Sequence, residues 1–408
     1  MVREEDTLSL REMTDTPKLR VALVHYWFVR VRGGQRVLEA LAEMFPQADI
    51  FTLVLDPKAL PPSLRSRKFT TSFLQKIPGM TRHYKKFLPL FPLALEQFKL
   101  DKYDLVISSE SGPAKGVLTR PHTCHICYCH MPMRYVWDMY HQYHAEKGMG
   151  VVSGSVFALA AHYMRIWDFA AAARVDHFVA NSQNVAGRIR KHYRRDATVI
   201  YPPVAVAGRA ISPIVDDFYL VVSRLVDYKR VDLAIEACNQ LGRPLKIIGD
   251  GEEYRRLRRL AGPSVTFLGY APDEVVRENY ARCRALLFPG EEDFGIVPVE
   301  AQSYGKPVIA YGRGGTLETV LGGLPGAGFD PEVATGVFFA EQTADSLAGA
   351  IRFFESARKG FSAERIRQNA LRFDAGRFQT EMRAFIEAKL LDFQSKGGDQ
   401  VSLKTVVI

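Results

Sequence analysis

The chain has 408 residues, 47% of them hydrophobic, and exceeds the length at which one core usually keeps growing, so two domains are expected. The formal charge of +9 indicates an anionic partner, for which nucleic acid, anionic lipid and nucleotide phosphate all qualify. The five cysteines are an odd set, with three between positions 124 and 129. This spacing argues against a disulfide framework.

The N-terminal residues 1–17 are charged and lack an apolar run, so they are expected to be a disordered lead-in without a secretory signal. The most apolar interval is 151–175, but His162, Arg165 and Asp168 interrupt it. The sequence therefore predicts no membrane-spanning helix.

The first predicted unit is a buried strand at 19–26, a loop with Gly33 and Gly34, and a helix at 35–45. The apolar residues of this helix recur with a 3.6-residue period. Strand, loop and helix are typical of the start of a Rossmann-like unit, in which glycines let backbone N–H groups approach a phosphate. An ordinary strand-to-helix turn explains the pattern about equally well.

Residues 64–100 mix basic and large apolar side chains, and prolines interrupt the helices there. Such a segment can rest on an anionic membrane surface, or it can be a solvated helical face above ordinary core residues. The net charge and the lack of a predicted span favour a peripheral membrane protein. The basic residues of the segment are Arg65, Arg67, Lys68, Lys76, Arg82, Lys85, Lys86 and Lys99.

A buried strand is predicted at 103–109, and a second one carries three cysteines and ends at His130. Alternate residues of a strand face opposite sides, so Cys127 and Cys129 face one way and Cys124 and His130 the other. Four converging ligands, which structural zinc needs, are therefore not expected, and the cysteines are interpreted as small buried hydrophobes. His130 stands at a strand's carboxyl end, where α/β sheets place ligand-contacting groups.

Further strands are predicted at 176–182 and 197–203, followed by an interdomain linker within 202–217. The second half repeats the alternation of strand and helix, with helices at 231–241 and 252–261. Apolar strands without polar alternation predict parallel, doubly wound α/β sheets. The second-half strands are predicted at 218–223, 245–249, 265–269, 285–289, 307–311 and 336–339.

These elements predict two Rossmann-like domains that face each other across a cleft between the carboxyl ends of their strands. The final helix is long and amphipathic, and it is expected to cross back to the N-terminal domain. The predicted parts are the lead-in at 1–17, an N-terminal acceptor-side domain at 18–205, a C-terminal donor-binding domain at 206–375, the crossing helix at 376–393 and a loose tail at 394–408.

Positive charge collects at the start of the second half, where Arg224 ends a strand and Lys229 opens the next helix. A guanidinium and an ammonium there can neutralise a diphosphate, above all one that departs as a leaving group. Two glycine-rich turns are predicted on the same edge of the sheet, at 249–251 and at 312–315, the second with Thr316 as a helix cap.

The stretch 288–311 contains two carboxylates, Glu292 in a loop and Glu300 in the helix that follows. Pro298 is expected to open this helix, with Glu300 in its first turn, and Gly305 to close it. A helix start suits a phosphate, and carboxylates beside it suit sugar hydroxyls.

The motifs together resemble the retaining glycosyltransferases of family four (group 1), which have the GT-B fold, over about residues 19–390. The pair Glu292 and Glu300 in EEDFGIVPVEA, with Phe-Gly after the first Glu, is the most specific motif. The CHMPMRYVWD run is similar to mannosyltransferases of bacterial polysaccharide assembly, such as that of lipopolysaccharide, which typically use GDP-mannose. One departure is Gln35-Arg36 after the Gly-Gly pair, where the family has a small residue and an acid.

The resemblance implies that His130 and Glu292 contact the donor sugar, that Glu300 binds the ribose and that the two cations hold the diphosphate. The implied catalytic residues are His130, Arg224, Lys229 and Glu292. The implied donor-binding residues are Gly33, Gly34, Arg224, Lys229, Gly249, Leu268, Glu292, Phe294, Gly295, Ile296, Val297 and Glu300.

The activity implied by this resemblance is that of a metal-independent hexosyltransferase that moves mannose from GDP-mannose onto a lipid-linked or growing polysaccharide acceptor. It would work at the inner face of the cytoplasmic membrane, without cofactor or nucleic acid. A UDP-sugar donor is an alternative. An NAD-dependent oxidoreductase predicts G-x-G-x-x-G after the first strand, which VRGGQRV does not provide. A non-catalytic basic binding protein predicts scattered charge rather than charge at strand ends.

Overall fold

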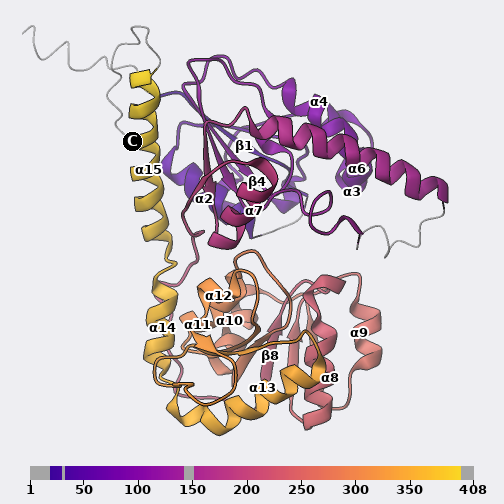
Figure 1. The fold of residues 1–408 in the computed structure, drawn as a ribbon, viewed down its shortest axis with the longest axis vertical. Helices are drawn as coiled ribbons and strands as arrows, with labels where there is room; N and C mark the ends of the chain where they lie inside the picture. Colours follow the sequence, from indigo (N-terminus) through magenta and orange to yellow (C-terminus); the bar gives the residue numbers. More distant parts are fainter. Residues whose placement is uncertain (1–18, 30–32, 142–150, 397–408) are drawn as a thin grey trace, which may run out of the picture. The chain divides into compact units, whose positions relative to one another are not determined.

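The computed structural model describes residues 19–29, 33–141 and 151–396, and it contains two compact units (Figure 1). The predicted lead-in at 1–17 lies outside the described residues, as does the predicted tail from 397 onward. Residues 394–396 continue the final helix instead. Among the described residues, the first unit contains the chain up to Asn181, Val185–Ile200 and the chain from Gln379, and the second contains Ser182–Asn184 and Tyr201–Phe378.

The first unit is built on seven strands: β1 (Val21–His25), β2 (Asp49–Thr52), β3 (Phe69–Thr71), β4 (Leu105–Glu110), β5 (Cys124–Cys129), β6 (His177–Ala180) and β7 (Ala197–Val199). They form one sheet in the order β3-β2-β1-β4-β5-β6-β7. All neighbouring strands in it are parallel. The order reverses between β1 and β4, and α/β sheets bind ligands at such switch points.

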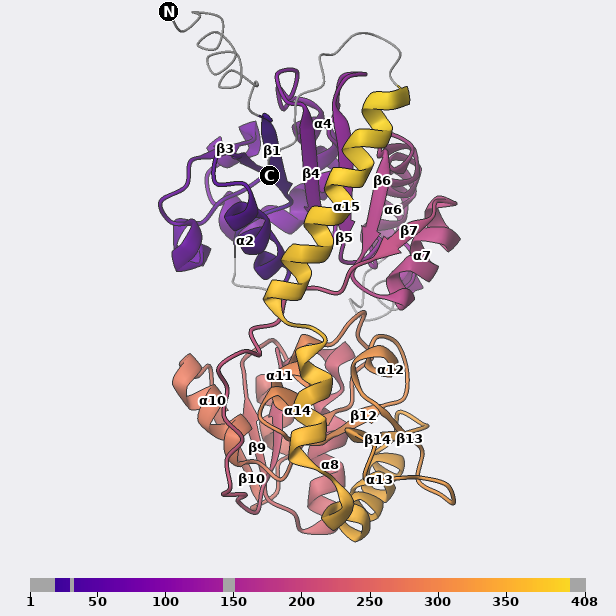
Figure 2. The ribbon, with the colours of Figure 1, turned by 90° about the vertical axis from the view of Figure 1, so that its left-hand side faces the viewer.

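The helices of the first unit cover both faces of its sheet (Figures 1 and 2). They are α2 (Gly34–Met44), α3 (Met80–His83), α4 (Phe91–Glu96), α6 (Val151–Ala172), α7 (Gln183–Tyr193) and the part of α15 (Ala375–Lys396) that follows Phe378. Helix α6 packs beside α4, where Trp167 Nε1 donates to Glu96 Oε1 over 3.0 Å. Helix α15 lies beside α2, where Gln379 Nε2 donates to Glu43 Oε2 over 3.0 Å.

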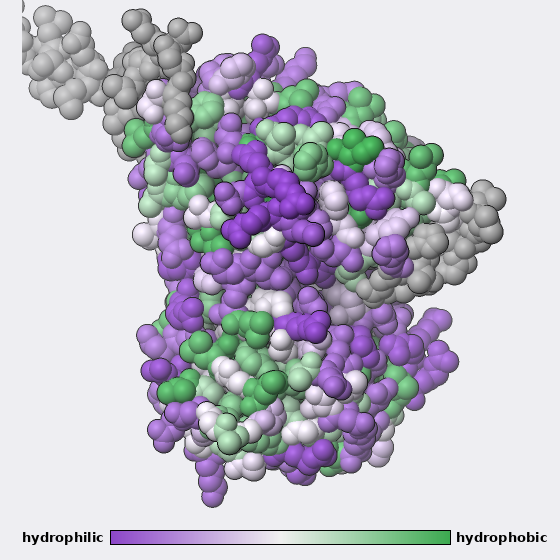
Figure 3. All heavy atoms as spheres, in the orientation of Figure 1, coloured by the Kyte–Doolittle hydropathy of each residue, from purple (hydrophilic) through white to green (hydrophobic). Residues whose placement is uncertain are grey.

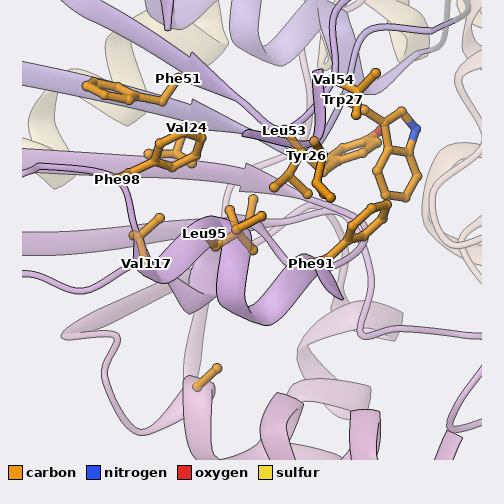
Figure 4. Close-up of a cluster of buried hydrophobic side chains, with 14 of the residues drawn as sticks. Val24, Tyr26, Trp27, Phe51, Leu53, Val54, Phe91, Leu95, Phe98 and Val117 are labelled. Atoms are coloured by element: carbon orange, nitrogen blue, oxygen red, sulfur yellow. The ribbon is translucent and has the colours of Figure 1, made fainter. Parts of the chain in front are cut away.

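An aromatic cluster fills the space between the sheet and α4 (Figure 4). The Trp27 ring lies 5.0 Å from that of Tyr84 and 5.7 Å from that of Phe91. Residues 64–100 are broken into short helices and turns, as the prolines predict, and their buried apolar side chains from Leu74 onward belong to this cluster. The segment is therefore anchored in the core of the first unit.

The second unit repeats the plan with strands β8 (Tyr219–Val222), β9 (Leu245–Ile248), β10 (Val265–Gly269), β11 (Ala285–Phe288), β12 (Val308–Tyr311), β13 (Gly322–Gly323) and β14 (Gly336–Phe339). Their order is β10-β9-β8-β11-β12-β14-β13, with all pairs parallel. Its helices are α8 (Val231–Leu241), α9 (Tyr254–Leu260), α10 (Asp273–Arg282), α11 (Ile296–Ser303), α12 (Thr316–Thr319), α13 (Ala344–Ala357) and α14 (Ala363–Leu371).

Two parallel, doubly wound sheets confirm the predicted α/β class with two Rossmann-like units. The units divide between Ile200 and Tyr201. The chain predicted as a linker at 202–217 begins as packed structure, because Val204 N donates to Phe373 O over 2.9 Å and the Val204 side chain is buried.

The five cysteines are all buried and none forms a disulfide, in agreement with their interpretation as small hydrophobes. Across the described ranges, no helix combines the length and the apolar character that crossing a bilayer requires.

Candidate active site

The loop after β8 carries the first predicted cation at the switch point of the second sheet. Arg224 follows the end of this strand, and its side chain is about one-third exposed, 3.2 Å from a carboxylate oxygen of Glu252. The neighbouring Leu225 N donates to Asp250 O over 3.0 Å, so the backbone of this loop is fixed to the turn after β9. The predicted Arg224 and Gly249–Gly251 features therefore lie together.

Gly249 is required by the close contact between these two turns. It has φ +137°, and a Cβ at this position would lie 1.8 Å from Ser223 O. Gly251 approaches Leu225 O in the same way, with a Cβ at 2.0 Å. Two backbones thus meet without side chains between them, which requires glycine at both positions.

Lys229 and Glu292 form an ion pair, with side chains 19% and 21% exposed. Lys229 ends a short 3₁₀ turn at Asp227–Lys229, and α8 begins only at Val231, so the prediction that Lys229 opens the helix is wrong. Arg230 lies between the 3₁₀ turn and α8, and its backbone is in the left-handed region with φ +50°. This kink turns the chain from the β8 loop into α8 and leaves Lys229 on the loop side.

The loop with Glu292 is held by the glycine-rich turn after β12. Gly315 N donates to Glu292 O over 2.7 Å, and a Cβ on Gly314 would lie 2.4 Å from the same oxygen. Thr316 is the first residue of α12 and not its cap, which is Gly315. Its hydroxyl lies 2.8 Å from both Tyr311 O and Arg313 O, and its one hydrogen is available to either carbonyl. The turn is therefore closed internally and braces Glu292 opposite Lys229.

Helix α11 begins at Ile296, not at Pro298 as predicted. Gly295, with φ +93°, supplies the change of direction that starts it. Glu300 consequently lies beyond the first turn, although Gly305 with φ +70° does close the helix as expected. The free N–H groups of the first turn fall at the predicted donor-binding residues Ile296 and Val297, next to Phe294 and Gly295.

Glu300 has a partner that the sequence did not indicate. Tyr280 in α10 donates its hydroxyl to Glu300 Oε2 over 3.2 Å, and its ring stacks on Tyr304 at 5.9 Å. Burial raises the pKa of Tyr280 well above its ordinary value, so the phenol stays protonated and keeps donating. Tyr280 lies inside a helix without any motif, so sequence spacing carries no signal for it.

The remaining predicted residue of the second unit, Leu268, lies in β10, and its side chain is exposed. Gly269 ends that strand with φ +67° and accepts a hydrogen bond from Gly249 N over 2.8 Å. The strand end predicted to lie by a base is thus directly joined to the glycine turn predicted to lie by the phosphates.

The first unit brings Gly34 and His130 together at its own switch point. Gly34 opens α2, and a Cβ there would lie 3.2 Å from His130 Nε2 and 3.2 Å from the Tyr26 hydroxyl. Gly33 precedes the helix with φ −57°, an ordinary helical value, and is exposed. The need for glycine in this pair therefore lies in the contact at Gly34, not in an unusual backbone angle.

His130 is oriented by the end of β4. Its Nε2 hydrogen-bonds Ser109 Oγ over 3.0 Å, and its backbone N donates to Glu110 O over 2.7 Å. Burial lowers the pKa of His130 to about 4, so the imidazole is neutral at pH 7 and one ring nitrogen can accept while the other donates. Ser109 was visible only as a polar residue at a predicted strand end.

The loop after His130 is fixed by a buried polar cluster. Lys115 is fully buried and pairs with Asp168 and, over 3.3 Å, with Glu110. Trp137 Nε1 and the Tyr193 hydroxyl each donate to Asp168 Oδ2 over 2.8 Å. The CHMPMRYVWD run is thereby tied through Trp137 to α6 and α7.

No three side chains of the His, Cys, Asp or Glu type gather as they would around a metal ion, as far as the structure describes the chain. At the edge of the second sheet, Arg224 and Lys229 place two positively charged side chains. Hydrogen-bonding carboxylates stand beside them. Such an arrangement suits a ligand with both phosphate oxygens and hydroxyl groups.

Two family models match consecutive parts of the chain. The model described as Glycosyltransferase Family 4 matches residues 31–207. The model described as Glycosyl transferases group 1 matches residues 211–373. Between them they include the predicted site residues of both units.

Curated relatives match over shorter stretches. The chain is 30% identical to an uncharacterized glycosyltransferase of Methanocaldococcus jannaschii over 158 residues, which cover 37% of this chain and 44% of that protein. It is 27% identical to the alpha-1,3/1,6-mannosyltransferase ALG2 of Homo sapiens over 195 residues, which cover 38% of this chain and 47% of that protein. The chain thus spans less than half the length of these relatives.

Solved structures share the fold at low sequence identity. Sucrose-phosphate synthase from Thermosynechococcus elongatus is 20% identical with a TM-score of 0.68, and the match covers 92% of this chain and 100% of that one. HepE from Anabaena, in complex with UDP and glucose, is 17% identical with a TM-score of 0.65, covering 90% and 99%. With the two family models, these likenesses lead to one assignment: the chain belongs to the family 4, group 1 glycosyltransferases and has the GT-B fold.

Proposed function

We propose that this protein is a retaining, metal-independent hexosyltransferase that moves mannose from GDP-mannose onto a lipid-linked or growing polysaccharide acceptor. The observation that carries the proposal is the grouping of Arg224 and Lys229 with Glu292 at one edge of the second sheet. Family membership favours a transferase over an NAD-dependent oxidoreductase or a non-catalytic basic binding protein.

The two cations stabilise the departing nucleoside diphosphate. When the bond between the sugar C1 and the β-phosphate oxygen breaks, negative charge grows on that phosphate. Arg224 and Lys229 are fixed beside the glycine turns before the reaction, so they lose little free energy in rearranging as the charge develops. In this proposal they supply the neutralisation that a divalent cation supplies elsewhere.

The acceptor hydroxyl attacks C1 on the face from which the diphosphate leaves. Its oxygen forms the new bond to C1, the bond from C1 to the β-phosphate oxygen breaks, and the hydroxyl proton passes to a β-phosphate oxygen. The products are the glycoside with retained configuration and the nucleoside diphosphate. No protein nucleophile takes part in this sequence.

Glu292 and Glu300 hold the donor rather than react with it. Glu292 is paired with Lys229, so the carboxylate and the ammonium lie together where the sugar joins the diphosphate. There the carboxylate accepts hydrogen bonds from sugar hydroxyls, and the ammonium lies beside the phosphate. Glu300 is oriented by Tyr280 and accepts from the ribose hydroxyls. His130 is neutral near pH 7 because burial lowers its pKa, so it contributes a hydrogen bond to the sugar and no charge.

Mannose as the transferred sugar is supported by the alpha-1,3/1,6-mannosyltransferase relatives and by the CHMPMRYVWD run. A second candidate donor is a UDP-sugar. It is favoured by the fold match to HepE, whose structure contains UDP and glucose.

A lipid-linked acceptor would require association with a membrane surface. The basic segment 64–100 supports this part of the proposal, because Glu96 is its one acidic residue and the charges of Lys76, Arg82 and Lys86 are exposed.

The experiment is a ligand panel read by melting temperature. GDP-mannose is expected to raise the melting temperature of the purified protein in a concentration-dependent way, more than UDP-glucose and far more than NAD, because only the folded state binds its donor. In Arg224→Ala the shift should fall strongly. In the control Arg255→Ala, an exposed arginine of α9, it should persist.

A larger melting-temperature shift with UDP-glucose would make a UDP-sugar the proposed donor in place of GDP-mannose. If none of the nucleotide sugars raised the melting temperature, the proposal would be overturned. Transfer that stops when a chelator is added would contradict the role given to Arg224 and Lys229.

A further inference from the structure

Helix α6 has its charged residues on the inside and its apolar residues on the outside. It is 22 residues long, Val151–Ala172. Of the three side chains that interrupt its apolar sequence, His162 is exposed, whereas the two charged ones are used within the first unit. Asp168 is fully buried and bound to Lys115, and Arg165 donates to Val136 O over 3.1 Å. Neither charge reaches solvent on the outer face.

The outer face carries a stripe of apolar side chains, with the exposed His162 beside it. Val156, Leu159, Tyr163 and Ile166 follow one another at intervals of three or four residues, so they share one side of the helix. Their exposed fractions are 65%, 72%, 46% and 59%. In Figure 3, hydrophobic side chains on this face of the first unit are visible among hydrophilic ones. Isolated exposed apolar residues are ordinary, but a row of four on one helix marks an interaction surface.

Basic residues flank the stripe. The 3₁₀ turn at Tyr84–Leu90 packs against α6, and its Phe87 and Leu88 join the core cluster that includes Met164 and Trp167. The same turn carries exposed Lys85 and Lys86.

The one acidic residue of this segment is engaged by other side chains. Glu96, the one acid between 57 and 100, accepts from Trp167 and pairs with Arg174 over 2.9 Å. A cationic rim therefore borders an apolar stripe on neighbouring elements.

We propose that the outer face of α6 inserts into the interfacial region of an anionic lipid bilayer, with Lys85 and Lys86 on the headgroups. This extends the membrane association proposed above and rests on it. The basic segment alone would hold the protein by charge, whereas α6 adds a hydrophobic contact that salt does not screen. The helix would lie in the plane of the interface and not cross it.

Charge favours a bilayer over a second copy of the chain. Two copies that met through this stripe would bring their basic rims together, and like charges repel. An anionic bilayer presents opposite charge around an apolar interior, which matches both parts of the surface.

The test is vesicle flotation with the full-length protein and vesicles of phosphatidylcholine with or without phosphatidylglycerol. The parent should float with the anionic vesicles. Leu159→Glu combined with Ile166→Glu should lower the partition coefficient at least about tenfold, because each carboxylate has to leave water on insertion. Leu391→Glu, on the exposed side of α15 and similarly exposed at 56%, should bind like the parent.

A second readout reports insertion directly. The five native cysteines are buried, so in Ile166→Cys the new thiol can be labelled selectively with an environment-sensitive fluorophore. Its emission should shift to the blue on anionic vesicles and be quenched by brominated lipid. The same label at Leu391→Cys should not respond.

The outcomes separate this inference from the donor assignment. Parent-like flotation of the double variant, no flotation of the parent, or a parent dimer that the double variant turns into monomer by light scattering would each overturn the role of α6. The melting shift with nucleotide sugar should be the same in parent and double variant. Loss of that shift in the parent would instead remove the proposed donor chemistry.

Discussion

At the scale of residues, buried histidines make the stability of the first unit depend on pH. His125 is fully buried and hydrogen-bonds Ser108 Oγ through Nε2 over 2.9 Å. Burial lowers the pKa of His125 to about 3, against about 6.5 in an unfolded chain. Below pH 6.5 the unfolded state therefore binds a proton that the folded state refuses. Stability from this residue is present above that pH and is lost as pH falls.

We expect the free energy of unfolding to fall by roughly 1.4 kcal/mol per pH unit from His125 between about pH 6 and 4. Glu110, whose pKa burial raises to about 7, contributes with the opposite sign. The contribution of Glu110 is still present in His125→Gln. The difference in pH slope of the free energy of unfolding between parent and variant therefore reports the histidine alone. All three tryptophans, Trp27, Trp137 and Trp167, lie in the first unit, and their fluorescence during urea unfolding is the measurement. Equal pH slopes in the two proteins would contradict it.

The sequence allowed a prediction of those site residues that stand, as charged residues, histidine or glycine turns, just after an apolar strand. Arg224, His130 and the glycine turns were proposed from the sequence because each follows an apolar strand. Their partners were not, since Tyr280 reaches Glu300 from the middle of another helix and Ser109 reaches His130 from a neighbouring strand. Such pairs are set by tertiary packing, which a single sequence does not display.

At the scale of elements, most apolar strands were predicted, but β2, β3 and β13 were not. Strand β2 pairs with β1, and β3 pairs with β2, so each depends on the edge that its neighbour offers. Length does not set them apart, because β8, β9 and β14 also have four residues and were predicted. The start of α11 was misplaced because Pro298 is compatible with any position of a first turn, whereas the φ of Gly295 fixes it.

The contact between the β8 and β9 turns predicts an asymmetry between two glycines. Gly249→Ala should lower the free energy of unfolding of the second unit by roughly 1–3 kcal/mol and weaken the melting shift with donor, because a Cβ there meets Ser223 O. Gly349→Ala in α13, where a Cβ meets nothing within 4 Å, should stabilise by about 0.5–1 kcal/mol. Differential scanning calorimetry compares them. Equal effects would show that the turns are not in close contact.

At the scale of the whole molecule, the first unit is made of separate chain segments. Its last segment, α15 from Gln379, buries Met382, Ile386 and Leu390. The second unit is nearly continuous, Tyr201–Phe378. The resemblance to the glycosyltransferase family suggested that the final helix returns to the first unit. The residue at which the helix passes from the second unit to the first depends on tertiary packing, which its amphipathic pattern does not specify.

Separate expression of fragments tests this division. Fragment 201–378 should melt cooperatively by itself. Fragment 19–200 should be much less stable until a peptide of residues 379–396 is added, since its α2 side otherwise leaves an apolar face in water. Circular dichroism melts with and without the peptide are the measurement. A fragment 19–200 whose melting temperature the peptide does not change would contradict the role given to α15.

The division of α15 between the units has a consequence for synthesis on the ribosome. Domains usually fold in the order in which they emerge. Here the unit that begins first is completed last, because Met382, Ile386 and Leu390 leave the exit tunnel only after the whole second unit has been translated. The nascent first unit therefore carries an uncovered apolar face for most of translation, and that face is a natural substrate for a ribosome-associated chaperone.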